Sequence, residues 1–221
     1  MEQDDFWEDP ERVARFADRD PDHRLVALLE SGDHSPLRCA LDLGCAGGRN
    51  SEYLARQGLE VHALDASEAM VAKTRERLAP IVGAEAARQR VRRGRIDDLS
   101  HFPDARFDLV VAIGVFHAAR SRGEWERAAA ETTRVLRPGG LLLFNQFTPE
   151  TDPTGEGLHP VPGEQDLYEG MPAGPVLLLD AAGLDAAWAA QGLRPLVPGE
   201  TKRVELEGGG RRVSVNTLYT R

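Results

Sequence analysis

The stretch from Leu41 to Asn50 reads LDLGCAGGRN and joins three kinds of local structure. A short apolar run ends at Leu43, glycines follow at positions 44, 47 and 48, and a helical pattern starts at Arg49. Glycine has no Cβ, so a bend of this kind brings backbone N–H groups and the start of a helix close to a ligand. The stretch therefore predicts a strand, a tight turn and a helix that together approach a bound molecule.

The alternation of strand and helix continues around this stretch. Strands are predicted at 39–43, 60–64, 91–96, 107–113 and 141–147, with helices at 49–57, 67–79 and 123–136. Such alternation is typical of a parallel sheet with helical crossovers. The run RPGG at 137–140 is expected to make the turn before the strand at 141–147, because proline and glycine end a helix.

The two ends of the chain depart from this alternation. Residues 1–35 have apolar side chains at helical spacing, which predicts an N-terminal cap of one or two helices with a break near Pro21. Residues 36–221 are expected to form one α/β domain. Within it, residues 149–175 carry six prolines and five glycines and are predicted to form a long lid loop. A helix at 177–190, a strand at 193–197, a glycine turn at 207–210 and a strand at 212–219 follow, and the last two strands are expected to pair antiparallel.

Composition limits the classes of partner and compartment. The chain has 221 residues, 41% hydrophobic and 29% charged, and a net charge of −9, so nucleic acid and anionic membranes are poor expected partners. No apolar stretch approaches the roughly 18 residues needed to span a bilayer. The N-terminus opens with Glu2, Asp4 and Asp5 rather than a basic targeting region. Two cysteines, Cys39 and Cys45, suit buried thiols better than a disulfide, and we expect a cytoplasmic protein.

An acid at the end of the second predicted strand narrows the class of ligand. Asp65 lies seventeen residues after Gly48, where a carboxylate accepts hydrogen bonds from both hydroxyls of a ribose. The glycine spacing does not match the G-x-G-x-x-G of dinucleotide sites. Asp42 would also repel a pyrophosphate but suit an ammonium group. The residues therefore favour a nucleoside cofactor with an amino-acid group over a nicotinamide dinucleotide.

These motifs resemble those of the class I S-adenosylmethionine-dependent methyltransferases over residues 36 to about 148. The family motif acid-x-Gly-x-Gly-x-Gly is matched by Asp42, Gly44, Ala46 and Gly48, with alanine in place of the middle glycine. The runs at 66–70, 107–110 and 136–140 resemble later landmarks, and 43–51 is also similar to tellurite-resistance and thiol methyltransferases. The resemblance implies a Rossmann-like α/β fold, with a seven-stranded, mostly parallel sheet, helices on both faces, an antiparallel last strand and an N-terminal helical cap.

The resemblance also implies S-adenosylmethionine as the cofactor and S-adenosylhomocysteine as the product. The ribose-binding acid of the family matches Asp65, although an acid there also suits a helix N-terminus. Asp42 has the alternative of satisfying backbone amides of the turn. Of the acids after the third strand, Asp97 is favoured for adenine. Cofactor contacts are expected from Asp42, Gly44, Cys45, Ala46, Gly48, Asn50, Asp65, Ala66, Met70, Asp97, Asp98 and Ile113.

The sequence says less about the residues that bind the methyl acceptor than about those that bind the cofactor. Because the sulfonium is already activated, methyl transfer depends mainly on holding the acceptor atom in line. A hydroxyl or ammonium acceptor would use a base, and His117 is the candidate, with a pKa suited to neutral pH and a core-edge histidine as the alternative. No acid cluster lies at 113–120, so no metal is expected. Acceptor contacts are expected from Phe6, Trp7, His117, Asn145, His159 and Tyr168.

The function predicted from these residues is methylation of an oxygen or nitrogen atom of a small-molecule metabolite by in-line displacement, with sulfur less favoured. A nucleic-acid methyltransferase is one alternative, but amino-base enzymes carry Asn/Asp-Pro-Pro-aromatic where this chain has Gly114 to His117. A non-catalytic partner protein that binds S-adenosylmethionine is another. The sequence leaves the acceptor and the oligomeric state open.

Overall fold

The structure is a computed structural model that describes residues 6–32 and 36–221. The acidic residues Glu2, Asp4 and Asp5 lie outside the described residues. The chain divides into two compact units. Unit 1 comprises residues up to Ile96 together with Arg106–Val111, and unit 2 comprises Asp97–Ala105 and Ala112–Arg221.

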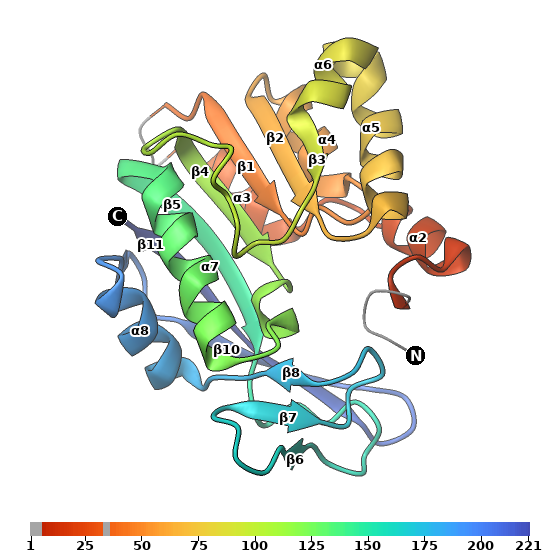
Figure 1. The fold of residues 1–221 in the computed structure, drawn as a ribbon, viewed down its shortest axis with the longest axis vertical. Coiled ribbons are helices and arrows are strands. Elements are labelled where there is room, and N and C mark those ends of the chain that lie inside the picture. The colour runs from red at the N-terminus through yellow and green to blue at the C-terminus, as the bar shows by residue number, and fades with distance from the viewer. Residues whose placement is uncertain (1–5, 33–35) are drawn as a thin grey trace. The chain divides into compact units, whose positions relative to one another are not determined.

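Unit 1 is built on four neighbouring strands in the order β4-β1-β2-β3. They are β1 (Cys39–Leu43), β2 (Glu60–Asp65), β3 (Val91–Arg93) and β4 (Phe107–Ile113), the last two residues of β4 being counted in unit 2. β2 pairs in parallel with both β1 and β3, which confirms the predicted parallel arrangement (Figure 1). The third strand is shorter than the predicted 91–96, because it lies at the edge of this set and its arginines point to solvent.

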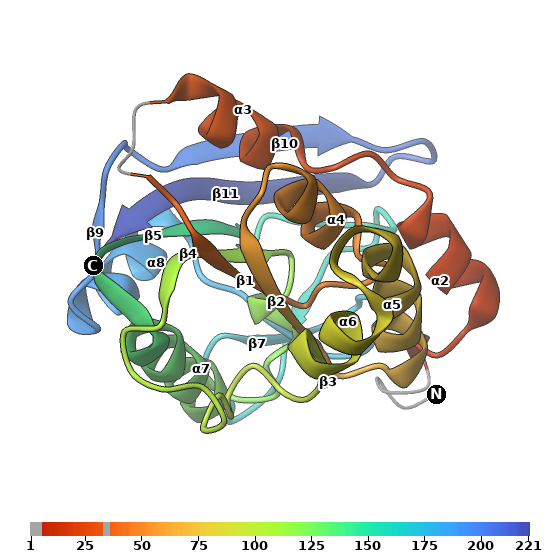
Figure 2. The same cartoon turned by 90° about the horizontal axis from the view of Figure 1, so that it is seen from above.

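The helices of unit 1 begin at residues that cap them. They are α2 (Pro10–Ala17), α3 (His23–Ser31), α4 (Arg49–Arg56), α5 (Glu68–Val82) and α6 (Ala84–Arg90). Asp9, Asp22 and Ser67 each accept a backbone N–H with the side chain at a helix start, as N-cap residues do. Pro21 lies between α2 and α3, as predicted. α2 and α4 both pack against α5 (Figure 2).

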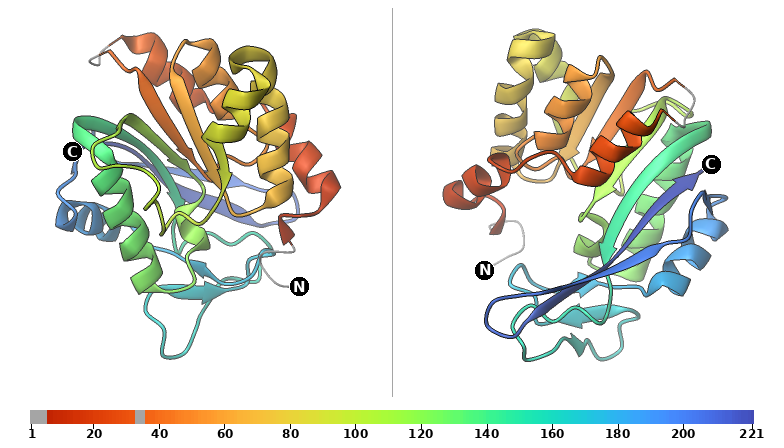
Figure 3. Two further views of the ribbon diagram at one scale, coloured as in Figure 1. Left: turned by 45° about the horizontal axis from the view of Figure 1, so that its top comes forward. Right: turned by 180° about the vertical axis from the view of Figure 1, so that it is seen from behind.

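Unit 2 contains a group of antiparallel strands. They are β5 (Leu136–Phe147), β9 (Arg194–Pro195), β10 (Glu200–Glu205) and β11 (Arg211–Thr220). β11 pairs antiparallel with β5 on one side and with β10 on the other, and the β10–β11 hairpin is visible in Figure 3. The antiparallel pair across the glycine turn is confirmed. The strand that enters this turn is β10 and not the predicted 193–197. The predicted segment contains the two-residue strand β9, which also pairs antiparallel with β11.

The strand β5 starts five residues earlier than predicted. Gly139 donates its N–H to the carbonyl of Arg221 at 2.9 Å, and Arg221 donates to the carbonyl of Gly140 at 3.1 Å. The prediction that the run at 137–140 forms a turn was therefore wrong. These residues do end helix α7 (Arg122–Val135), but the last residue of the chain pairs with them, and Gly139 adopts a φ of +75° that glycine tolerates.

The segment 149–175 was predicted to be a loop and is only partly one. It contains β6 (His159–Pro160) and β7 (Leu167–Glu169), which form a small sheet with β8 (Val176–Leu177). Because β8 pairs with β7, helix α8 (Ala181–Ala190) starts after the capping residue Asp180 rather than at 177.

The core of unit 2 is a set of fully buried rings that contact one another, namely Phe116, Trp125, Phe144 and Trp188. No helix among the described residues is both long enough and apolar enough to cross a membrane.

Candidate active site

The turn between β1 and α4 is held to β2 by backbone hydrogen bonds. Gly44 and Cys45 donate their N–H groups to the carbonyl of Leu64 at 2.8 and 3.1 Å. Gly44, Ala46 and Gly48 have left-handed φ angles of +68°, +48° and +81°. A left-handed conformation costs an alanine roughly 1–2 kcal/mol, so Ala46 holds strain where the family motif has glycine.

The next two glycines of the turn are needed for packing within unit 1. A Cβ atom on Gly47 would lie 2.6 Å from the Cα of Ala17 in α2. One on Gly48 would lie 3.0 Å from the Cα of Thr74 in α5. Real Cβ atoms do not sustain the separation at Gly47, and the one at Gly48 is tighter than most real contacts, so these glycines allow α2 and α5 to approach the turn closely. A contact between Gly48 and the cofactor stays a prediction.

Asp65 ends β2 beside this turn. Its carboxylate accepts the N–H of Ala46 at 2.8 Å and the N–H of Ser67 at 3.0 Å. Burial raises the pKa of Asp65, the nearby charge of Glu8 adds to the rise, and the backbone N–H groups of Ser67, Ala46 and Ala66 oppose it. An ionised carboxylate has about four lone-pair sites, so it can accept hydroxyls of a ligand in addition to these N–H groups.

The segment that precedes α2 is attached to the start of α5, next to Asp65. Ser67 Oγ donates to the carbonyl of Trp7 at 3.0 Å. The Glu8 carboxylate accepts the N–H groups of Glu68 and Ala69 at 2.9 and 3.1 Å, as an acid at a helix N-terminus does. Glu8 is not predicted by the sequence pattern, because the helix it caps begins about sixty residues later. The expected acceptor contacts of Phe6 and Trp7 stay predictions.

Three other expected cofactor residues have partners inside unit 1. Buried Asp42 accepts Ser51 Oγ at 2.6 Å, and burial raises the pKa of Asp42 to about 6. Asn50 Oδ1 accepts the N–H of Asp22 at 2.9 Å. Cys45 Sγ lies 3.4 Å from Thr74 Oγ1. These side chains thus connect the turn and α4 to neighbouring parts of unit 1. Of the other expected cofactor residues in this unit, Met70 is buried in α5 and Ala66 is exposed.

The two acids expected near adenine lie in unit 2 and have protein partners there. Asp97 forms an ion pair with Arg127, with 3.2 Å between Oδ2 and the guanidinium. Asp98 accepts both the hydroxyl and the N–H of Ser100 at 2.6 and 3.2 Å, and these bonds lower the pKa of Asp98. Ile113 is the last residue of β4. Their cofactor contacts stay predictions.

His117 lies in a short helical turn, η1 (Phe116–Ala118), just after β4. Its ring centroid is 4.8 Å from that of Phe147, and among the described residues its Nδ1 atom has no hydrogen-bond partner. Burial lowers the pKa of His117 to about 4, because the charged imidazolium is poorly solvated there. The expectation of a pKa suited to neutral pH was therefore wrong, and the imidazole is neutral at pH 7.

Asn145 supplies a second polar group close to His117. Its Nδ2 donates to Asn216 Oδ1 at 2.7 Å across the β5–β11 pair. A Cβ atom on Gly114 would lie 3.8 Å from His117 Cε1 and 4.0 Å from Asn145 Oδ1, so both side chains border this glycine. Asn216 was not predicted as a site residue. The signal in the sequence is an amide within the apolar alternation of β11.

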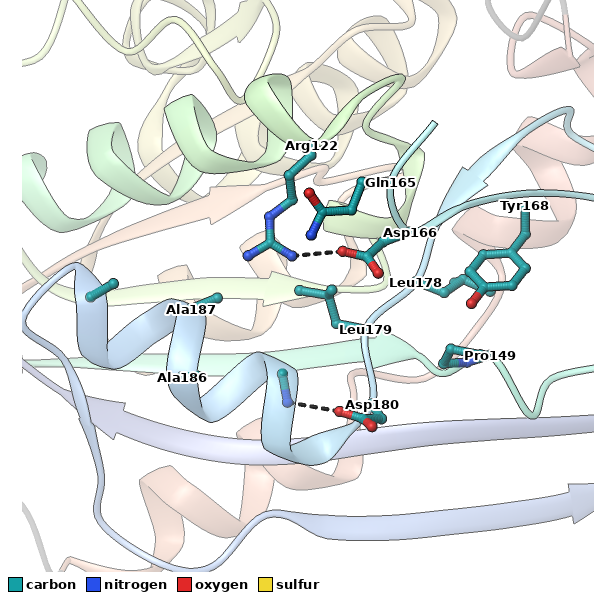
Figure 4. A pocket seen from close by; sticks show the side chains of 12 residues that line it. Arg122, Pro149, Gln165, Asp166, Tyr168, Leu178, Leu179, Asp180, Ala186 and Ala187 are labelled. Carbon is teal, nitrogen blue, oxygen red and sulfur yellow. Dashed lines mark hydrogen bonds and ion pairs between the residues drawn. The ribbon is translucent and has the colours of Figure 1, made fainter. Parts of the chain in front are cut away.

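Tyr168 lies on the wall of a cavity of about 460 Å³ in unit 2. Figure 4 shows the cavity between the start of α7, the segment that carries β7, and one side of α8. An ion pair of 2.9 Å between Arg122 and Asp166 lies on one side of it, and Leu179 and Ala187 are on the other. His159 is exposed on β6 and does not line this cavity. The acceptor contacts expected from both residues stay predictions.

The match to a protein family falls on the β1 turn and the strands that follow. Residues 41–144 match the family described as "Methyltransferase domain". We identify these residues as a methyltransferase domain, of the class I S-adenosylmethionine-dependent type that the sequence motifs resemble. S-adenosylmethionine is the cofactor of this family, as the resemblance in the sequence implied.

Curated relatives of this methyltransferase domain are enzymes with different acceptors. The chain is 34% identical over 132 residues to malonyl-[acyl-carrier protein] O-methyltransferase of Pectobacterium atrosepticum, which covers 59% of this chain and 46% of that protein. It is 35% identical over 122 residues to ribosomal RNA small subunit methyltransferase C of Alcanivorax borkumensis, covering 53% and 35%. The chain therefore spans less than half the length of these two relatives.

A solved structure confirms the predicted fold. The 1,6-didemethyltoxoflavin-N1-methyltransferase of Burkholderia thailandensis is similar with a TM-score of 0.61 and 23% identity, over 98% of this chain and 81% of that one. At this identity the similarity shows the fold alone. The fold is the Rossmann-like one of methyltransferases, with a mostly parallel sheet and an antiparallel edge.

Proposed function

We propose that the protein transfers a methyl group from S-adenosylmethionine to an oxygen or nitrogen atom of a small molecule, with sulfur as the weaker alternative. The observation that carries the proposal is the position of the Asp65 carboxylate at the end of β2, bonded to the turn that follows β1. Paired strand ends of this kind bind nucleosides in Rossmann-like sheets. The methyltransferase domain at 41–144 includes both strand ends.

The residues of this region fit the cofactor. The free lone pairs of Asp65 suit the two ribose hydroxyls, and the carboxylates of Asp42 and Asp65 suit a molecule with a sulfonium and an ammonium group. The bend at Gly44 leaves its backbone without a side chain on the ligand side. When bound, S-adenosylmethionine supplies a methyl group on a positively charged sulfur that is ready for displacement.

His117 and Asn145 are proposed to bind the acceptor. A neutral imidazole and a carboxamide can each accept or donate one hydrogen bond and so orient a hydroxyl, amine or carboxyl group. A histidine with a pKa of about 4 is a weak base at pH 7. We therefore favour acceptors that need no strong base, such as a neutral amine, a carboxylate or an acidic hydroxyl, over an aliphatic alcohol.

A small molecule is favoured over RNA by the charge and the size of the available space. The net charge of −9 repels a phosphate backbone, and the cavity beside Tyr168 falls in the range typical of small-ligand sites. We propose that this cavity receives part of the acceptor. The RNA-methylating relative makes RNA the alternative that the experiment must include.

The compartment proposed for this activity is the cytoplasm. Both cysteines are free thiols and both are buried. A reducing compartment keeps such thiols reduced, so the proposal agrees with the thiol state in the structure.

The test combines binding and turnover on the full chain. Calorimetry with S-adenosylmethionine and S-adenosylhomocysteine should show binding, and release of S-adenosylhomocysteine should be measured with panels of amines, phenols, carboxylic acids, thiols and structured RNA. Turnover with a small molecule, reduced in the Asp65→Asn variant, is the expected result. Turnover with RNA alone, or binding without turnover on any panel, would contradict the proposal.

A further inference from the structure

A second group of reactive side chains lies at the amino ends of β1 and β2, the ends opposite to the cofactor turn. Cys39 is the first residue of β1, and Glu60 and His62 are the first and third residues of β2. One ligand atom from each of the three lies within 4.8 Å of the others. His62 Nε2 and Glu60 Oε1 are 2.9 Å apart. The expected cofactor and acceptor residues do not include these side chains.

The strand register explains why these three side chains meet. Cys39 pairs with Glu60 and Leu41 pairs with His62 in the parallel β1–β2 ladder. Residues at i and i+2 of a strand lie on the same face, so Glu60 and His62 point to the same side of β2. The site is therefore fixed by three backbone positions in two adjacent strands rather than by a loop.

Residues of a third strand of unit 1, β4, contact the cluster and the start of β1. The Phe107 ring in β4 meets the His62 ring edge-on, with 5.6 Å between centroids. The Asp108 carboxylate accepts the N–H groups of Arg38 and Cys39 at 2.6 and 2.8 Å, which fixes the start of β1. Cys39 is buried, whereas the Glu60 side chain is 40% exposed. The cluster thus has a buried sulfur and a side that is open to solvent.

We propose that Cys39, Glu60 and His62 bind a divalent metal ion of the zinc class, at a site separate from the active site. Thiolate, imidazole and carboxylate are the ligand types that zinc takes in proteins, with bonds of about 2.3 Å to sulfur and about 2.0–2.2 Å to nitrogen and oxygen. Tetrahedral ligand atoms at those bond lengths lie about 3.3–3.6 Å apart. Metal binding therefore requires the three side chains to rotate inward from the observed spacing of up to 4.8 Å. Calcium and magnesium are disfavoured, because the cluster offers a single carboxylate.

Metal binding must change the charges of the side chains at this site. On binding, the Cys39 thiol releases its proton to solvent, and the sulfur bonds to the metal in its place. The Cys39 thiolate and the Glu60 carboxylate then balance the two positive charges of the ion. The Arg106 guanidinium donates to Glu60 Oε1, the same carboxylate oxygen that faces His62. That guanidinium must move to the other carboxylate oxygen or leave when the metal binds, so the thiolate is required for charge balance.

Cobalt(II) is the probe, because a cobalt–thiolate bond has a charge-transfer band in the near ultraviolet. We expect the full, chelator-treated protein to bind one cobalt ion with this band and to lose the band when zinc is added. The Cys39→Ser variant should lose the band, and the His62→Gln variant should bind cobalt at least tenfold more weakly. The matched control is His23→Gln, an exposed histidine in α3 of the same unit, which should bind as the wild type does.

Thermal unfolding gives a second readout that is independent of methyl transfer. Zinc should raise the Tm of the wild type and of His23→Gln but leave that of His62→Gln nearly unchanged, since an ion that binds only the folded state stabilises it. Absence of a cobalt band in the wild type would overturn the proposal, as would a full band in Cys39→Ser. If Cys39→Ser does not fold, wild-type cobalt affinity in a folded His62→Gln variant would equally overturn it.

Discussion

The Asp65 carboxylate accepts the backbone N–H of Ala46 at 2.8 Å, so the end of β2 holds the turn that follows β1. The other oxygen of the same carboxylate accepts the N–H of Ser67 at 3.0 Å, at the start of α5. Asp65 therefore fixes two backbone segments before any ligand is considered. A ligand hydroxyl that bonds to this carboxylate meets an acceptor that is already oriented.

Replacing Asp65 by asparagine keeps the shape but exchanges one acceptor oxygen for a donor. We expect the affinity for S-adenosylhomocysteine to fall at least tenfold, about 1.4 kcal/mol, as measured by calorimetry. Asp104→Asn is the matched control, because Asp104 is an exposed acid in unit 2. Its affinity should equal that of the wild type. Unchanged affinity in Asp65→Asn would remove this residue from the cofactor site.

The fold of unit 1 could be predicted because its signals are local. The apolar run of β1, the glycine turn and the capping Ser67 are all read within a few residues of the elements they define. The start of β5 and the strand β10 could not be predicted in this way. Their pairing partners, Arg221 and β11, are set by tertiary contacts that a local pattern does not contain.

The same distinction applies to the candidate site. Asp65 and Asn145 have strand positions that the sequence pattern predicts, and the structure places them at those positions. Glu8 and Asn216 were missed because each acts on a residue at least sixty positions away in the chain. The neutral state of His117 at pH 7 could not be predicted either, because its pKa depends on burial in the folded chain.

Ala46 gives a prediction about stability. Its φ of +48° is costly for alanine and free for glycine. The stability gained by removing this strain is partly offset, because glycine also makes the unfolded chain more flexible. We expect Ala46→Gly to raise the free energy of unfolding by about 0.5–1 kcal/mol, measured by urea denaturation. Ala14→Gly on the exposed face of α2 should instead lower it by about 1 kcal/mol, and a loss of similar size in both variants would show that the turn is not strained.

Asp42 predicts a stability change with pH. Its pKa is raised to about 6 in the folded chain from an ordinary value of 3.8, so the folded state keeps a proton that the unfolded chain releases. Stability is therefore lost as pH rises from about 4 to about 6. The hydrogen bond from Ser51 can persist in the Asp42→Asn variant, because an amide oxygen also accepts a hydroxyl.

We expect the stability of Asp42→Asn relative to the wild type to increase by about 2–3 kcal/mol between pH 4 and pH 7. Urea denaturation at several pH values in this window measures the difference. The control Asp18→Asn changes an exposed acid, and its difference from the wild type should stay nearly constant. A constant difference for Asp42→Asn as well would mean that Asp42 is ionised in the folded state at about pH 5.

His117 separates acceptor binding from cofactor binding. Glutamine at this position keeps a hydrogen-bonding group but removes the imidazole. Once an acceptor is identified, His117→Gln should lower kcat/KM at least tenfold and change the affinity for S-adenosylhomocysteine less than twofold, by about 0.4 kcal/mol at most. Equal losses in both quantities would indicate a structural role for the ring.

The His117→Gln variant also tests the ionisation of His117. The contribution of His117 to stability changes with pH in the opposite direction to that of Asp42. The pKa of His117 is lowered from 6.5 to about 4 on folding, so below pH 6.5 the unfolded chain binds a proton that the folded state does not. The stability this residue contributes is present above about pH 6.5 and is lost as pH falls toward 4. The wild type should therefore lose up to about 3 kcal/mol more than His117→Gln over this window, measured by urea denaturation.

His23→Gln, which changes an exposed histidine, should follow the wild type, because the burial that shifts the pKa of His117 is retained in that variant. If His117→Gln loses as much stability as the wild type between these pH values, the imidazole is solvated enough to take its proton at an ordinary pKa, and a role as a general base near neutral pH becomes available to it.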